Sequence, residues 1–281
     1  MPRISEIYRP KSLKYALKLR AENPNAKPIL GGTDLFVQLR GRREDTQLLD
    51  LSLLRELRGI KRIGETLWIG ASATHHDISV SKLVIKFAPL IAKSSAILGS
   101  PAIRNRGTIG GNVANASPVA DSIPTLIAHG ANVHLVSLRG KREIQIEEFH
   151  LAPGKTVIEK DEIILGFSLP IIGNGFFGFY ERLGSRAAVS IAKVGVALAS
   201  RRSGNILSDV RIALSAVAPK VIRAPKAEEF ISGKPLTKEL IEKASEILAT
   251  ECAPITDHRS TCEYRGDMVA SLFKIGMESA L

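Results

Sequence analysis

The chain has 281 residues, only two cysteines, and a formal net charge of +11 from 39 lysines and arginines against 28 aspartates and glutamates. A chain of this length buries roughly 75% of the surface that its unfolded form exposes, so a cored fold needs no disulfides, and two domains are more typical than one. No apolar run follows the basic residue near the first methionine, so we expect no secretory signal, and no stretch approaches the ~18 apolar residues that a membrane span needs. Sparse cysteines favour a reducing compartment, so we expect the cytoplasm.

The positive charge is not organised as in a nucleic-acid-binding protein. Its lysines and arginines are dispersed along the chain, without a long basic run, a zinc-finger pattern or an aromatic RNA-binding motif. An anionic cofactor and acidic partner surfaces are the more economical explanation. A basic binding module without a cofactor remains the alternative.

The first part of the chain predicts a helix, a strand and a glycine turn. Residues 12–22 have helical spacing with Ser12 as the cap, and residues 28–30 form a short apolar strand. Gly31 and Gly32 then open onto a helix over 34–40, whose N-terminal amides and dipole attract anions. Asp34 is expected to cap that helix, so that an anionic ligand contacts backbone N–H groups instead.

A small sheet and a histidine pair follow. Strands over 47–51, 59–63 and 67–71 are expected to form one sheet that closes a first lobe of about 52 residues. His75 and His76 invite a metal interpretation, but neighbouring helical residues point about 100° apart and cannot easily share one ion. Capping of a helix by Thr74 is the favoured role for this segment.

The next stretch contains a helical region over 79–98, interrupted at Pro89, and then a glycine-rich motif at 104–121. Gly107, Gly110 and Gly111 allow positive φ and close approach of the backbone to a ligand, and inward-turned amides there would form a nest for phosphate oxygens. A sharp turn between packed elements is the alternative. Asp121 begins a further helix, which it can cap.

Beyond residue 130 the chain alternates strands, a linker and helices. The linker is the proline- and glycine-rich stretch 170–175. The remaining elements indicate an α+β arrangement, with three antiparallel strands and helices after the linker. Strands are expected at 132–138, 143–146, 162–169, 176–183, 188–200 and 206–217, and helices at 224–232, 237–252 and 261–280.

The two glycine motifs resemble those of the FAD-binding medium subunit of the molybdenum hydroxylases, the family of xanthine dehydrogenase, carbon monoxide dehydrogenase and related aldehyde, nicotinate and aromatic oxidoreductases. The motifs are Gly-Gly-Thr-Asp at 31–34, Thr-Ile-Gly-Gly-Asn at 108–112, Ala-Ser-Pro-x-Ala-Asp at 116–121 and Glu-Tyr-Arg at 263–265. The resemblance implies an α+β fold. A two-lobed FAD-binding domain of the PCMH or vanillyl-alcohol-oxidase type would span 1–172, with lobes of about 1–52 and 53–172, before a three-stranded C-terminal domain over 176–281.

The resemblance also implies a set of cofactor-contacting residues and no catalytic or metal-binding residue. In it, Asp121 accepts a hydrogen bond from the sugar-like chain of FAD, Ile164 makes an apolar contact with the ring, and Arg182 lies near the flavin. A helix cap and a surface arginine are the alternatives for Asp121 and Arg182. The implied set is Leu30, Gly31, Gly32, Thr33, Asp34, Thr74, Leu98, Thr108, Ile109, Gly110, Gly111, Asn112, Asp121, Ile164 and Arg182.

The function that follows from the resemblance is electron transfer within a larger enzyme. FAD would collect electrons from [2Fe–2S] clusters of a small partner, after a large molybdopterin-binding partner oxidises the substrate, and would pass them to an external acceptor. The family pattern implies a heterotrimer doubled into a heterohexamer. Two cysteines cannot supply the four ligands of a [2Fe–2S] cluster within this chain. The alternative is a self-contained FAD-dependent oxidoreductase resembling the enolpyruvyl-sugar reductase of cell-wall synthesis.

Overall fold

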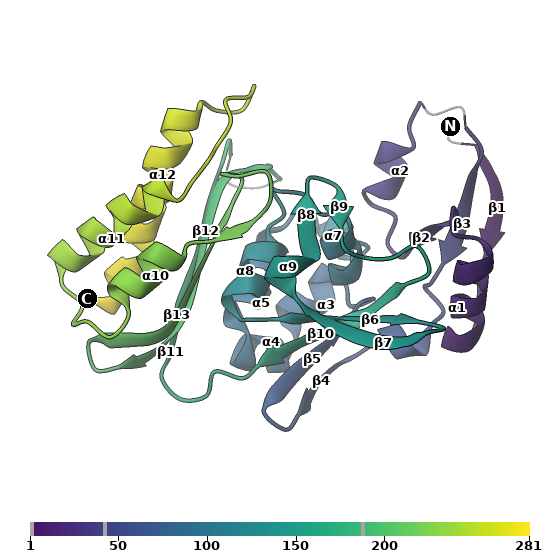
Figure 1. The fold of residues 1–281 in the computed structure, drawn as a ribbon, viewed down its shortest axis with the longest axis horizontal. Coiled ribbons are helices and arrows are strands. Elements are labelled where there is room, and N and C mark those ends of the chain that lie inside the picture. Colours follow the sequence, from purple (N-terminus) through teal and green to yellow (C-terminus); the bar gives the residue numbers. More distant parts are fainter. Residues whose placement is uncertain (1–2, 42–43, 187–188) are drawn as a thin grey trace.

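The computed structural model describes residues 3–41, 44–186 and 189–281. Within these residues, the strands form sheets of three, five, four and two strands, and helices pack around them. The three-stranded sheet lies at one end of the molecule, the five-stranded sheet in the middle, and the four-stranded sheet with the last helices at the other end (Figure 1). None of the described helices combines the length and apolarity that crossing a membrane requires.

The first sheet is parallel and has the order β1-β3-β2, formed by β1 (Ile4–Tyr8), β3 (Thr46–Asp50) and β2 (Lys27–Ile29). Helix α1 (Leu13–Glu22) crosses between β1 and β2, and the Ser12 hydroxyl accepts from the Tyr15 amide at its N-terminus, which confirms the predicted cap. Helix α2 (Leu35–Gln38) follows β2 and has only four residues.

The second sheet is antiparallel and has the order β4-β5-β10-β6-β7. The predicted single sheet over 47–71 is therefore wrong, because β3 joins the first sheet and the next two strands join the second. Between them the chain turns at η1 (Arg55–Leu57), where Leu54 and Leu57 are buried and redirect it. The strands are β4 (Ile60–Ile63), β5 (Thr66–Gly70), β10 (Ile163–Pro170), β6 (Asn132–Ser137) and β7 (Gly140–Gln145).

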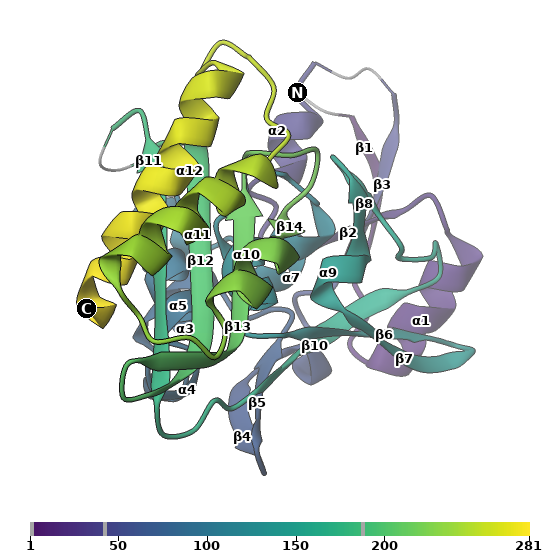
Figure 2. The same cartoon turned by 60° about the vertical axis from the view of Figure 1, so that its left-hand side comes forward.

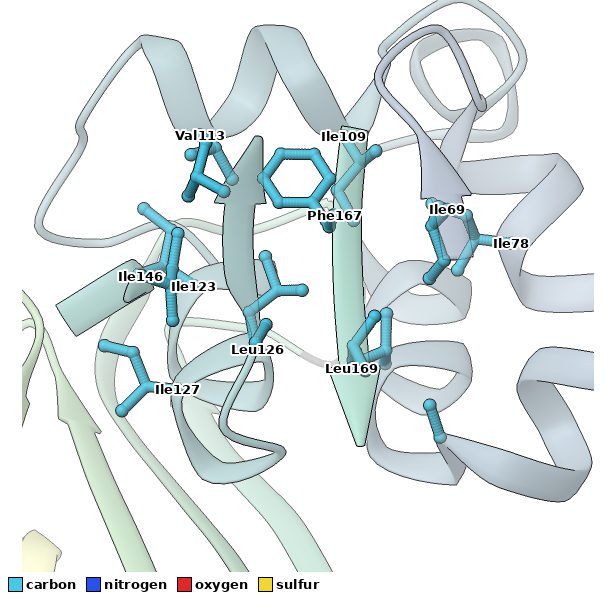
Figure 3. Close-up of a cluster of buried hydrophobic side chains, with 14 of the residues drawn as sticks. Ile69, Ile78, Ile109, Val113, Ile123, Leu126, Ile127, Ile146, Phe167 and Leu169 are labelled. Atoms are coloured by element: carbon cyan, nitrogen blue, oxygen red, sulfur yellow. The ribbon is translucent and has the colours of Figure 1, made fainter. Parts of the chain in front are cut away.

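Helices between β5 and β6 cover one face of this sheet. Figure 3 shows the resulting core, in which Ile109 and Val113 of α7 lie beside Phe167 of β10. The opposite face packs against α1 and β3 through a second apolar cluster that includes Leu49 and Leu165. The helices are α3 (His75–Val80), α4 (Lys82–Phe87), α5 (Pro89–Ile97), α6 (Pro101–Arg104), α7 (Ile109–Ala114) and α8 (Ser122–Ala128).

A short segment over residues 146–156, called the excursion below, lies between β7 and β10 in the chain. Helix α9 (Ile146–Phe149) buries Ile146 and Phe149 against the core of the second sheet, and β8 (His150–Ala152) then pairs with β9 (Lys155–Thr156). His150 joins this excursion to α7, since its Nε2 lies 2.8 Å from the Val113 carbonyl oxygen. The excursion therefore supports the helix that carries the second glycine motif.

The C-terminal sheet is antiparallel with the order β11-β12-β13-β14. The expected three strands are present, as β11 (Phe176–Gly184), β12 (Ala192–Ser203) and β13 (Ile206–Ser215). The prediction missed β14 (Ile222–Arg223), because two residues are too few for an alternating pattern. Residue 188, where the middle strand was expected to begin, lies outside the described residues, and β12 begins at Ala192.

Helices cover both faces of the C-terminal sheet. Helices α10 (Pro225–Ile231), α11 (Lys238–Thr250) and α12 (Cys262–Met277) lie on the outer face, and η2 (Glu278–Ala280) ends the chain (Figure 2). Helices α5 and α8 of the preceding part contact the inner face at β11, β12 and β13. The C-terminal sheet is thus joined to the rest of the chain through the same helical layer that covers the second sheet.

Candidate functional site

A cleft of about 500 Å³ lies between the first sheet and the helical layer of the second. Its volume falls within the ~300–1,000 Å³ typical of sites for small molecules and cofactors. The cleft brings together the two glycine motifs, β10 and the end of α5. Of the expected cofactor residues, it is lined by Leu30, Gly31, Gly32, Thr33, Asp34, Leu98, Thr108, Gly110, Gly111, Asn112 and Ile164.

The two glycine motifs touch each other at the cleft wall. A Cβ atom on Gly31 would lie 1.9 Å from the carbonyl oxygen of Arg106, so the contact requires a residue without a side chain. On the other side of the second motif, the Thr74 and Thr108 backbones form an isolated antiparallel bridge. The first and second glycine motifs, about 75 residues apart in sequence, therefore form one wall of the cleft.

The first glycine motif presents unpaired donors. The amides of Gly32, Thr33 and Asp34 donate no hydrogen bond to any other described residue. Gly32 has φ of +70°, a left-handed conformation that glycine adopts without strain. Successive free amides along such a turn form a nest that attracts phosphate or carboxylate oxygens. This segment therefore has the glycine turn and the available backbone amides that the sequence predicted for it.

The second glycine motif is a helix, which corrects the expectation of a second nest. The amides of Ile109 and Gly110 donate to the Ala73 and Ala71 carbonyls, each at 3.0 Å, and the Gly111 amide donates to the Thr108 hydroxyl at 3.2 Å. None of the motif's glycines has a left-handed φ. Glycine is needed here for its missing side chain and not for its φ, because these positions either pack closely against other residues or leave the cleft open.

Gly110 is the glycine that packs closely, and Gly111 is the one that leaves the cleft open. A Cβ on Gly110 would lie 2.7 Å from the Ala71 carbonyl oxygen, so that glycine permits α7 to pack against the end of β5. A Cβ on Gly111 would meet only the Thr108 hydroxyl, at 3.1 Å, and otherwise open space. Gly111 is exposed and lines the cleft. It therefore offers bare backbone to a ligand.

Asp34 does not cap α2, contrary to the prediction. Its side chain makes no capping bond, and it accepts a hydrogen bond from Gln38 Nε2 at 2.5 Å instead. Gln38 Nε2 also donates to Asn115 Oδ1 at 2.8 Å, and all three residues line the cleft. The side chains therefore bridge the first motif to the residue that ends α7. With only four residues, α2 is too short to have shown its boundaries in the sequence.

The groups in the cleft that attract negative charge are backbone amides more than cationic side chains. Arg20 is the only arginine or lysine among the described residues that line it, and its Nη1 donates to the carbonyls of Pro24 and Ala26 at 3.2 and 2.8 Å. His75 is neutral at physiological pH, because burial lowers its pKa to about 4. The free amides of the first motif are thus the principal anion-attracting groups.

An acidic residue that lines the cleft, Glu162, is neutralised within the protein. Arg142 donates two hydrogen bonds to the Glu162 carboxylate, at 2.5 and 2.7 Å. Burial acts to raise the pKa of Glu162, but the bonds from Arg142 and from the Glu159 amide outweigh it and keep that pKa below its usual value. Nothing in the sequence alone had marked Arg20, Gln38, Asn115 or Glu162 as cleft residues.

Four expected residues do not line the cleft. Thr74 caps α3, as predicted, and the structure adds that it does so in a capping box with Asp77, so it supports the wall indirectly. Ile109 is buried in the core of the second sheet (Figure 3). Asp121 and Arg182 lie together between α8 and β11. Contacts of these four residues with a cofactor stay predictions. The described residues contain no cluster of metal-ligating side chains, at the histidine pair or elsewhere.

The capping role considered for Asp121 is wrong, and so is the surface role for Arg182. Asp121 precedes α8 but makes no capping bond, and its Oδ1 accepts from the Tyr180 hydroxyl at 2.8 Å. Arg182 Nε lies 3.3 Å from the same Oδ1 and its side chain is only 8% exposed. Tyr180 is 1% exposed, so it does not offer its ring to the cleft.

The comparison with known protein families agrees with this arrangement. Residues 3–172 match the model of the FAD binding domain in molybdopterin dehydrogenase, and residues 180–280 match that of the CO dehydrogenase flavoprotein C-terminal domain. The chain belongs to the flavoprotein subunits of the molybdenum hydroxylases. Like its relatives in this family of oxidoreductases, it binds FAD.

Relatives in this family match the chain almost from end to end. The carbon monoxide dehydrogenase medium chain of Hydrogenophaga pseudoflava is 32% identical over 277 residues, which are 98% of this chain and 96% of the relative. The xanthine dehydrogenase FAD-binding subunit of Escherichia coli O157:H7 is 31% identical and covers 96% and 94%. A solved carbon monoxide dehydrogenase from H. pseudoflava superimposes with a TM-score of 0.95 at 32% identity, covering 100% of this chain and 98% of that chain.

Proposed function

We propose that this flavoprotein subunit transfers electrons within a molybdenum hydroxylase, from the [2Fe–2S] clusters of a partner through FAD to an external acceptor. The observation that carries the proposal is the cleft, which is lined both by Gly32, Thr33 and Asp34 with their unpaired amides and by a backbone left bare at Gly111. Donors without partners and space without side chains suit a dinucleotide diphosphate.

The residues of this chain would hold and orient the cofactor. The first motif's amides bind diphosphate oxygens, while Leu98 and Ile164 supply apolar contacts in the same cleft. Asp121 accepts a hydrogen bond from a cofactor hydroxyl. Bound FAD supplies the redox chemistry, and the protein supplies its binding, orientation and electrostatic surroundings.

The subunit would work with two others, a large molybdopterin-binding subunit and a small [2Fe–2S] subunit, in a heterotrimer doubled into a heterohexamer. The names of two relatives support partners, since both are medium chains of carbon monoxide dehydrogenases. The net charge of +11 favours acidic surfaces on those partners. We assign cofactor binding to residues 1–172, in lobes of about 1–52 and 53–172, and a separate domain to residues 176–281.

The proposal is tested with the purified full chain. Loaded with FAD, it should bleach with dithionite but show little turnover with aldehydes, purines, nicotinate or carbon monoxide. Co-expression with the partner subunits should restore oxidation of one of these substrates. Rapid oxidation of an organic substrate by this chain alone would contradict the subunit assignment and favour a self-contained oxidoreductase.

A further inference from the structure

The buried cluster of Asp121, Tyr180 and Arg182 joins two distant parts of the chain. Asp121 lies at the start of α8, and the other two residues lie on β11 of the C-terminal sheet. Asp121 is 7% exposed and Tyr180 is 1% exposed, so little water screens their contact. A buried hydrogen bond between a tyrosine and a carboxylate is charge-assisted and stronger than a neutral one.

Both contacts are made to one oxygen of the carboxylate. The Tyr180 hydroxyl donates to Oδ1 at 2.8 Å, and Arg182 Nε lies 3.3 Å from that oxygen in an ion pair that lacks hydrogen-bond geometry. Oδ2 accepts no hydrogen bond from any described residue, and 10% of the Asp121 side chain remains exposed. The carboxylate is thus anchored through Oδ1, whereas Oδ2 has no hydrogen-bond partner among the described residues.

The cluster is connected by hydrogen bonds to the cleft wall and to the segment that follows β11. Ser122, the next residue, donates from its hydroxyl to Asn112 Oδ1 at 2.5 Å, and Asn112 lines the cleft. Arg182 Nη2 donates to the backbone carbonyl of Ser190, which fixes the guanidinium from a second direction. The orientation of Asp121 is therefore determined by β11 on one side and by the second glycine motif on the other.

We propose that Tyr180 and Arg182 are positioning residues for the cofactor: they hold Asp121 Oδ1 from the C-terminal sheet and so leave Oδ2 for a hydroxyl group of FAD. The inference rests on the proposed function, in which Asp121 accepts that hydrogen bond. It gives the C-terminal sheet a part in FAD binding although neither Tyr180 nor Arg182 lines the cleft.

The charge of Asp121 depends on the same two residues. Burial raises the pKa of Asp121, and the Arg182 charge and the Tyr180 hydrogen bond oppose that rise. Glu181, between them on β11, is paired with Lys93 of α5 at 2.8 Å. Removing the Tyr180 hydroxyl should therefore let the carboxylate become protonated at a higher pH, and a protonated Asp121 is a poorer acceptor.

The test is a double-mutant cycle on FAD affinity, measured by fluorescence titration of the full apo-chain. Tyr180→Phe should weaken FAD binding ~tenfold in the parent, since a hydrogen bond to a charged group is lost, and less than twofold in the Asp121→Asn background. As the pH is lowered, the FAD affinity of Tyr180→Phe should also begin to fall at a higher pH than the FAD affinity of the parent does. Tyr8→Phe, which removes a hydroxyl bonded to Glu6 in β1, is the control and should change neither quantity.

Unchanged affinity in Tyr180→Phe, or an equal loss in both backgrounds, would overturn the positioning role. If Asp121→Asn itself binds FAD as tightly as the parent, the cofactor contact of Asp121 is wrong, and the inference fails with it. If Asp121→Asn alone weakens binding, that contact stands and only the role of Tyr180 fails. Thermal unfolding of each apo-protein shows whether a loss of affinity reflects a loss of folding.

Discussion

The adjacent glycines of the second motif provide a sharp test, because the structure assigns them opposite environments. Gly111→Ala places a methyl group in the cleft, where only the Thr108 hydroxyl lies within 4 Å, at 3.1 Å. Gly110→Ala places the same methyl group 2.7 Å from the Ala71 carbonyl oxygen and 2.8 Å from the Ala71 Cβ. One change fills ligand space, and the other disturbs protein packing.

The expected changes in the free energy of unfolding differ between the two variants in sign as well as in size. In Gly111→Ala the apo-protein should gain about 0.5–1 kcal/mol of unfolding free energy, because alanine is the better helix former and φ there is not left-handed. FAD affinity should fall about tenfold or more, as for overpacking of a fitted site. Gly110→Ala should instead cost ~1–3 kcal/mol of stability, as overpacking of a core does.

The assays are urea unfolding of the apo-proteins and fluorescence titration with FAD, applied to both variants and the parent. Gly111→Ala should be stable and poor in flavin, whereas Gly110→Ala should be less stable. Parental FAD affinity in a folded Gly111→Ala protein would refute the assignment of bare backbone at this position to the cofactor.

Two further predictions concern stability. Between pH 6.5 and the folded-state pKa of about 4, His75 binds protons in the unfolded chain but not in the folded one, so stability should fall as pH falls. Its contribution to the loss from pH 7 to pH 5 is about 2 kcal/mol, and urea unfolding should show a flatter pH dependence in His75→Leu; an unchanged slope would contradict burial of a neutral imidazole. Thr74→Ala should lower the unfolding free energy by about 1 kcal/mol through loss of the α3 cap, while Thr74→Ser should retain most of it; equal stability of the two variants would count against the capping box.

The sequence predicted the parts of the site that depend on local chemistry. Gly32 combines a left-handed φ with neighbouring free amides, and a glycine pair after an apolar strand is a local signal for such a turn. Thr74 caps its helix for equally local reasons, since a threonine followed three residues later by an acid forms a capping box. Most elements after residue 120 were located by strand alternation and helical spacing.

Other features could not be predicted because they depend on residues distant in sequence. Asp121 resembles a cap in the sequence, but its partner is the hydroxyl of Tyr180, 59 residues away. Gln38, which donates to the Asp34 carboxylate, is also held by Asn115, 77 residues away. The second motif was expected to expose its amides, but Gly110 donates to Ala71 at the end of a strand. Contacts of this kind between distant segments have no signature in a single segment.

The most direct test of the account is a crystal structure of the full chain with FAD bound. We predict diphosphate oxygens within hydrogen-bonding distance, ~2.7–3.2 Å, of the amides of Gly32 and Thr33, with the cofactor backbone passing over Gly111. A diphosphate bound elsewhere, with the amides of the first glycine motif still without a partner, would contradict the account.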